Sequence, residues 1–227
     1  MNRDGSSAVE TPGAKAPACP IVIASFRDYQ PPFDPAPIVR RMLESVPEKY
    51  LLGLGKVVLT NASGLPRKRR RSTTKSRRRK VRVIETRGLH HPAFDGGRAW
   101  IEMFVDNTLR GWENGWWLRI PLVYEGKIGD VLFHEIGHHI HFSSRPEYRE
   151  REDVADVWKV RLQNQYTKKR FRWTAGFGRL IRPLLGSFMD RLQAKVETRL
   201  LRMGQISRAE YEESMRTLKS DKTSFPQ

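Results

Sequence analysis

The sequence predicts an α+β fold in which a small, mostly antiparallel sheet packs on a histidine-rich helix and on an acidic helix that follows it. Short β-branched stretches of strand length occur at 56–60, 81–85 and 99–105. Apolar residues recur at helical spacing from Ile38 to Val46. Four of the six histidines fall within residues 134–141. The length of 227 residues suits one such domain with appendages rather than two full domains.

Composition divides the chain into three parts. Residues 1–20 are rich in Ser, Ala, Gly and Pro, which predicts a disordered tail without the apolar core of a signal peptide. Residues 21–167 form the main domain, and residues 168–227 form a basic, amphipathic helical extension. No stretch approaches 18 apolar residues, so no transmembrane helix is expected. A single cysteine, Cys19, cannot form an internal disulfide, which favours a cytoplasmic location.

The elements of the main domain follow in order. The apolar pattern from Ile38 predicts a helix, and Pro47 starts a short second helix that ends before Gly53. Strands are then expected at 56–60, 81–85 and 99–105, and the segment 118–122 extends the sheet. The histidine-rich helix comes next, and the acidic helix follows a turn at 143–147.

A strongly basic segment, at 66–80, separates the first two of these strands. Residues 67–80 hold ten basic side chains and no acidic one, within a net charge of +17. Such a run predicts a mobile loop that projects from the sheet. Arg67–Lys80 is expected to bind nucleic acid, to bind another polyanion, or to be a solvated loop without a partner. No aromatic residue is interleaved, so base stacking is not indicated.

The histidine-rich segment contains His134-Glu135-Ile136-Gly137-His138, an H-E-x-x-H arrangement. On a helix, the imidazoles at positions i and i+4 converge on one metal ion. Glu135 lies beside them without pointing at the same spot, so it can accept a proton from the attacking water. Gly137 indicates close approach of another backbone to the helix.

A third ligand, if it comes from downstream, must be a carboxylate. His141 lies about 10 Å along the helix from His134, which is too far for one ion, and no histidine follows it. If two antiparallel helices fold about residue 145, Glu152 lies level with His138 and Asp156 level with His134. This arrangement suits a ligand and a carboxylate that orients a ligand imidazole. Glu150 and Asp153 remain substitutes, because the position of the turn is uncertain by two residues.

The pattern H-E-x-G-H, a short spacer and E-x-x-A-D resembles the gluzincin clan of zinc metallopeptidases over residues 134–156. The resemblance implies a zincin-like fold and Zn²⁺ bound by His134, His138 and Glu152. It further implies that Glu135 is the general base and that Asp156 braces a histidine. The compact size is similar to that of small bacterial metallopeptidases that cleave regulatory proteins.

The resemblance also sets expectations for function. It implies hydrolysis of peptide bonds in a protein or peptide substrate by zinc-activated water. A sheet edge pairs with extended substrate in such folds, and 99–105 is the candidate strand, unless it is an ordinary core strand. Tyr148 and Tyr166 are the tyrosines considered for stabilising the oxyanion. The alternative function is a nucleic-acid-associated basic protein whose zinc site is structural or conditionally proteolytic.

The C-terminal extension carries apolar residues every four positions from Leu180 to Leu200. The stripe predicts an amphipathic helix that packs against the body of the protein. Peripheral membrane contact through residues 168–201 is the alternative, because the same segment is basic.

Overall fold

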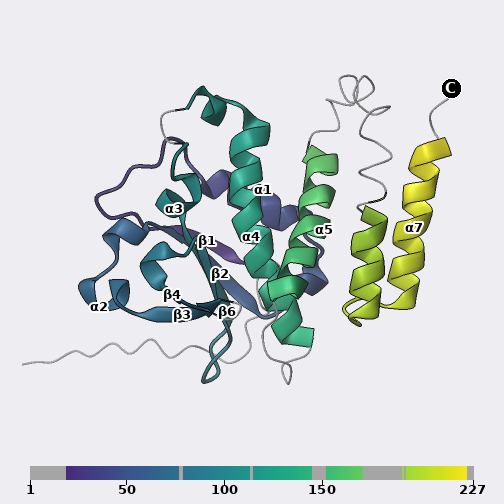
Figure 1. Cartoon of the computed structure of the whole chain (residues 1–227), viewed down its shortest axis with the longest axis horizontal. Coiled ribbons are helices and arrows are strands. Elements are labelled where there is room, and N and C mark those ends of the chain that lie inside the picture. The colour runs from purple at the N-terminus through teal and green to yellow at the C-terminus, as the bar shows by residue number, and fades with distance from the viewer. Residues whose placement is uncertain are drawn as a thin grey trace, which may run out of the picture.

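The chain alternates short strands with helices and then continues in longer helices (Figure 1). The computed structural model describes residues 19–76, 79–112, 115–144, 152–170, 191 and 193–223. The strands are β1 (Ile21–Ala24), β2 (Leu54–Thr60), β3 (Thr73–Ser76), β4 (Arg79–Arg82), β5 (Gly88–His91) and β6 (Ala99–Phe104). The helices are α1 (Ala36–Ser45), α2 (Arg67–Arg70), α3 (Val105–Leu109), α4 (Pro121–Ser144), α5 (Glu152–Arg170) and α7 (Arg208–Thr223). Short 3₁₀ turns are η1 (Glu48–Tyr50), η2 (Ala62–Gly64), η3 (Val83–Glu85) and η4 (Trp116–Arg119).

These elements confirm the predicted α+β class, but the direction of the strands was predicted wrongly. Four strands form one sheet in the order β1-β2-β6-β5. The pairs β1–β2 and β2–β6 are parallel, and only β5–β6 is antiparallel. The sheet is therefore not mostly antiparallel. The connections from β1 to β2 and from β2 to β6 are long enough to cross over and return in the same direction.

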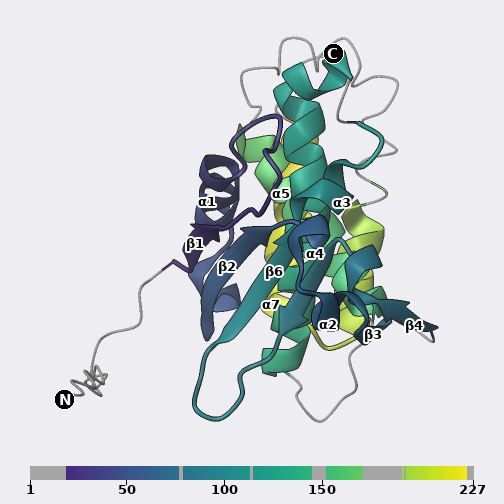
Figure 2. The same cartoon turned by 90° about the vertical axis from the view of Figure 1, so that its left-hand side faces the viewer.

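The hydrophobic core lies between this sheet and α4, which α1 and α5 flank (Figures 1 and 2). Leu132, Phe133 and Ile136 of α4 have no exposed surface. Val57 on β2 and Ile101 on β6 are equally buried and belong to the same apolar cluster. Helix α4 is thus held on several sides along the stretch that carries the histidines.

Two strand predictions need correction. The segment 118–122 is not a strand: it ends the turn η4 and begins α4 at Pro121. Proline lacks an N–H and has a φ that suits the first helical turn, so it favours the start of this helix. The predicted strand at 81–85 is β4 only as far as Arg82, after which η3 follows.

The basic segment is structured where it is described, so the expectation of a mobile loop is corrected. Residues 67–70 form α2, and β3 pairs with β4 in an antiparallel hairpin beside it (Figure 2). Arg69 donates two hydrogen bonds to the buried Glu102 carboxylate on β6, the Nη1–Oε1 bond being 2.7 Å long. Burial alone would raise the pKa of Glu102, but hydrogen bonds from His91 and Arg69 outweigh it and lower that pKa. Pairing with a single buried carboxylate therefore anchors a segment that its own composition would leave unfolded.

The described part of the C-terminal extension packs on the body of the protein. Residues 193–202 are helical, and Val196 and Leu200 are buried in the main core. Arg161 of α5 forms an ion pair of 3.1 Å with Glu197, and both side chains are buried. Helix α5 itself continues to Arg170, so the boundary predicted at residue 168 falls inside a helix. The predictions for 1–18 and for 171–190 lie outside the described residues.

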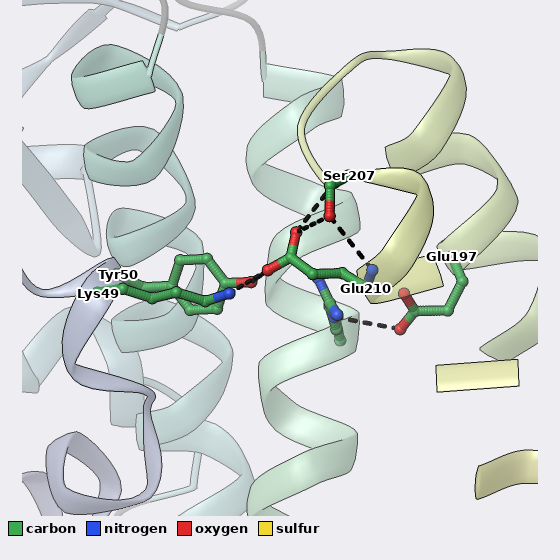
Figure 3. A network of polar contacts seen from close by, with 6 residues as sticks. Lys49, Tyr50, Glu197, Ser207 and Glu210 are labelled. Carbon is green, nitrogen blue, oxygen red and sulfur yellow. Dashed lines mark hydrogen bonds and ion pairs between the residues drawn. The ribbon is translucent and has the colours of Figure 1, made fainter. Parts of the chain in front are cut away.

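A network of hydrogen bonds connects α7 to the turn η1 (Figure 3). Glu210 accepts hydrogen bonds from Lys49, from the Tyr50 hydroxyl at 3.3 Å and from the Ser207 backbone N–H at 2.9 Å. Burial alone would raise the pKa of Glu210, but the bonds from Lys49 and Ser207 lower it to about 2. Helix α7 is therefore tied to the domain through a carboxylate that stays ionised. Among the described helices, none is both long enough and apolar enough to span a membrane.

Candidate metal centre

Helix α4 brings the two histidines of the H-E-x-x-H motif together. His134 and His138 lie one turn apart, and their Nε2 atoms are 3.1 Å from each other. His138 is 5% exposed, whereas the side chain of His134 is 21% exposed. The pair therefore presents two ring nitrogens toward one point at the surface of the helix.

Glu152, the first residue of α5, completes a group of three ligand atoms. Its Oε2 lies 3.3 Å from His134 Nε2 and 3.8 Å from His138 Nε2. Zinc with tetrahedral ligands and Zn–N bonds of about 2.0–2.1 Å separates two ligand atoms by about 3.3 Å. Among the described residues, His134, His138 and Glu152 form a group of potential metal ligands within 4.8 Å of one another. The donor types and spacings thus fit zinc.

Asp156 lies one turn further along α5, behind His134. Its Oδ1 is 3.1 Å from His134 Nδ1 and 3.3 Å from the Lys159 ammonium. A carboxylate on Nδ1 fixes the ring so that Nε2 faces the ligand group. The two helices expected from the sequence therefore bring Glu152 and Asp156 to the histidines, but Glu152 lies nearer to His134 than to His138, with which the sequence placed it level.

Glu135 lines the same cleft as this group and lies against strand β5. It is 6% exposed. A Cβ atom added to Gly88 would lie 2.6 Å from Glu135 Oε1 and 2.8 Å from Val131 Cγ1. A side chain at position 88 would therefore displace the Glu135 carboxylate from the place that it occupies beside β5. Sequence analysis missed both β5 and the role of Gly88, because a four-residue segment containing Gly and two histidines has no β-branched residue to signal a strand.

The two histidines differ in their electrostatic environment. Burial alone lowers the pKa of His134, but the hydrogen bond to Glu152 and the charges of Glu135 and Asp156 outweigh it and raise the pKa. Burial, together with the neighbouring His134, lowers the pKa of His138 to about 4. His138 is therefore neutral at neutral pH, the form in which imidazole binds a metal. A bound cation would compensate the carboxylates that crowd His134.

A cleft of about 420 Å³ opens over these side chains. Its lining includes His134, Glu135, His138 and Glu152 from the two helices, and residues 85–90 from the opposite side. Strand β5 is at the edge of the sheet, since its partner in the described part of the chain is β6 alone. Strand β6 lies between β2 and β5, so the predicted edge position for 99–105 is wrong, and 99–105 is the ordinary core strand that was the alternative.

The other candidate residues are placed elsewhere or lie outside the described residues. Asp153 forms an ion pair of 3.4 Å with Arg199, away from the histidines. The Tyr166 hydroxyl donates to Glu125 at 2.5 Å within the core, and burial followed by this bond raises its pKa to about 12. Tyr166 is therefore not an oxyanion donor at this site. Glu150 and Tyr148 lie outside the described residues.

No protein-family model, curated protein or solved structure matches this chain. The residues of the site come from two helices and one strand.

Close packing of α4 on α5 sets the distance between the ligand residues. A Cβ at Gly137 would lie 2.8 Å from both the Cα and the carbonyl oxygen of Ala155. These are backbone atoms, so the contact cannot relax by rotation of a side chain. The expectation of a close backbone approach at Gly137 is confirmed.

We expect Gly137→Ala and Gly126→Ala, both in α4, to change stability in opposite directions. A Cβ at Gly126 would meet nothing within 4 Å. Gly126→Ala should therefore raise the free energy of unfolding by about 0.5–1 kcal/mol. Gly137→Ala should lower it by about 1–2 kcal/mol, because overpacking outweighs the gain in helix propensity. Urea denaturation with chelator present measures both without a contribution from bound metal. Equal stabilisation by the two substitutions would show that the helices separate freely.

Proposed function

We propose that this chain is a zinc-dependent metallopeptidase with a zincin-like fold, acting on a protein or peptide in the cytoplasm. The observation that carries the proposal is the convergence of His134, His138 and Glu152, with Asp156 behind one imidazole. A site that serves structure alone needs four protein ligands to close it. Only three converge among the described residues, and they face an open cleft. This arrangement leaves one position for a water and a substrate.

The residues of the site have different roles in the proposed hydrolysis. Zinc, when bound, polarises the scissile carbonyl and makes water more acidic. Glu135 lines the same cleft as the ligand group without belonging to it, and its carboxylate would take a proton from the attacking water. The same carboxylate then delivers the proton to the leaving amine. Asp156 holds the His134 ring in the tautomer that leaves Nε2 for the metal.

Gly88 of β5, which is an edge strand in the described sheet, lies against Glu135 in the lining of the cleft. The free edge of a strand binds an extended peptide through main-chain hydrogen bonds. A polypeptide lying along β5 would pass beside Glu135 and the ligand group. This geometry favours a peptide bond as the bond that is cut.

Metal removal tests the proposal directly. The full-length protein, reconstituted with zinc and dialysed, should hold about one zinc per chain. It should hydrolyse an unfolded protein such as casein, lose that activity with a chelator and regain it with added zinc. Failure to retain zinc after reconstitution would overturn the proposal. One bound zinc together with hydrolysis that ignores the chelator would overturn the catalytic role of the metal.

A further inference from the structure

The basic hairpin forms one wall of the cleft. Thr74 on β3 and Val81 on β4 are directly opposite each other in the hairpin. Both line the cleft that contains His134 and Glu135. The basic segment thus does not extend away from the site. Its positive charge therefore acts on any molecule that binds in the cleft.

Strand alternation divides the basic side chains of the hairpin between its two faces. Arg79 lies two residues before Val81, so it shares the face that lines the cleft. Lys80 lies on the opposite face by the same rule. Arg87, next to Gly88, also lines the cleft, and both Arg79 and Arg87 are exposed. Arg87 therefore lines the cleft, and strand alternation puts Arg79 on the same face of the hairpin as the cleft-lining Val81.

The acidic groups at the border of the cleft already have cationic partners. Glu85 pairs with Arg82 at 2.7 Å, and Asp130 pairs with Lys159 at 3.2 Å. By contrast, no carboxylate within the described ranges forms an ion pair with Arg79 or Arg87. As far as the described residues go, these two guanidinium groups are available to a carboxylate from another molecule.

We propose that the substrate of this site is an acidic polypeptide segment, whose Asp or Glu side chains on either side of the scissile bond pair with Arg79 and Arg87. The proposal rests on the proposed peptidase function and adds the substrate class to it. Arg79 and Arg87 are specificity residues rather than catalytic ones, because they lie at the border of the cleft. Their pairing with substrate is exposed and weakens with salt.

Geometry favours an acidic polypeptide over a nucleic acid. The floor of the cleft carries Glu135, Glu152 and Asp156. A polypeptide can place its uncharged backbone over this floor and its carboxylates at the border, whereas a nucleic acid carries a charge at every phosphate. No Phe, Tyr or Trp is among the described residues that line the cleft, so these residues offer no stacking platform for bases.

Peptide binding to the zinc-reconstituted, full-length Glu135→Gln protein tests the inference without cleavage. The probes are fluorescein-labelled peptides in which glutamates flank a central Ala-Leu pair, and the same peptides with glutamine in place of glutamate. Fluorescence anisotropy at low salt should show about tenfold tighter binding of the glutamate peptide. Arg79→Ala and Arg87→Ala should each weaken its binding by about two- to fivefold. Neither should change binding of the glutamine peptide.

Lys80→Ala is the matched control, since it removes the same charge from the neighbouring position on the other face of the hairpin. It should leave the affinity for the glutamate peptide unchanged. Equal effects of Arg79→Ala and Lys80→Ala would overturn the proposal, as would equal affinity for the two peptides or no binding of either. Tighter binding of a short DNA duplex, reduced equally by all three substitutions, would assign the hairpin to nucleic acid instead.

The proposed peptidase function is judged by a separate measurement, the zinc content and chelator-sensitive hydrolysis of the parent protein. A protein that holds zinc and cleaves, but does not prefer the glutamate peptide, overturns the substrate class alone. A protein that binds the glutamate peptide through Arg79 without retaining zinc overturns the peptidase and leaves an acidic-peptide-binding module.

Discussion

Substitution of Glu135 by Gln is expected to leave the zinc content at the parent level and to lower turnover by about 10²–10⁴-fold, the contribution of a positioned general base. The amide has the size of the carboxylate and fits the same space against Gly88, where a Cβ would lie 2.6 Å from Glu135 Oε1. It cannot accept the proton of the attacking water. Zinc per chain and the initial rate of peptide hydrolysis, measured on the same preparation, separate the two effects.

Glu85→Gln serves as the control for this experiment. Glu85 lines the same cleft but is exposed and paired with Arg82. Its substitution should change turnover of an uncharged peptide by less than about threefold, because an exposed ion pair contributes little. If Glu135→Gln hydrolyses peptides at the parent rate, another group accepts the proton and the mechanism proposed for this site is wrong.

Local periodicity explains which parts of the structure the sequence could predict. The helix α1, the strands β2 and β6 and the helical position of the H-E-x-x-H motif follow from spacing within a few residues. The convergence of Glu152 and Asp156 with the histidines required only that two helices run antiparallel from a turn near residue 145. One residue advances a helix by about 1.5 Å, so an error of two in the turn still leaves the ligand within reach.

Interactions distant in sequence explain the failures. The basic segment is held in place by the hydrogen bonds between Arg69 and Glu102, which are 33 residues apart. The composition of the segment cannot predict such a pair. The parallel direction of β1, β2 and β6 depends on how the connections cross the sheet, whereas alternation along a strand is the same in either direction. Strand β5 is defined by its antiparallel pairing with β6 and by the space left for Glu135, not by its own residues.

Substitution of Glu152 by Ala is expected to remove most of the zinc from the protein, because two imidazoles are left to hold an ion that prefers three protein ligands in a catalytic site. Asp153→Ala is the matched control. It removes a carboxylate from the next residue, but Asp153 pairs with Arg199 at 3.4 Å and faces away from the histidines. Zinc per chain after dialysis against a metal buffer should fall sharply for the first variant and stay near one for the second.

Asp156→Asn should give an intermediate result, since Asp156 contacts His134 Nδ1 at 3.1 Å and acts on zinc only through that ring. Loss of such a partner lowers metal affinity by about 10- to 100-fold, so this variant should bind zinc at high free metal and release it at low free metal. We expect zinc affinity to fall from Asp153→Ala to Asp156→Asn and again to Glu152→Ala. This order would identify Glu152 as the ligand, Asp156 as the partner of His134 and Asp153 as a residue outside the site. Equal zinc retention by Glu152→Ala and Asp153→Ala would contradict the ligand set, because only the first substitution removes a carboxylate that lies beside His134 and His138.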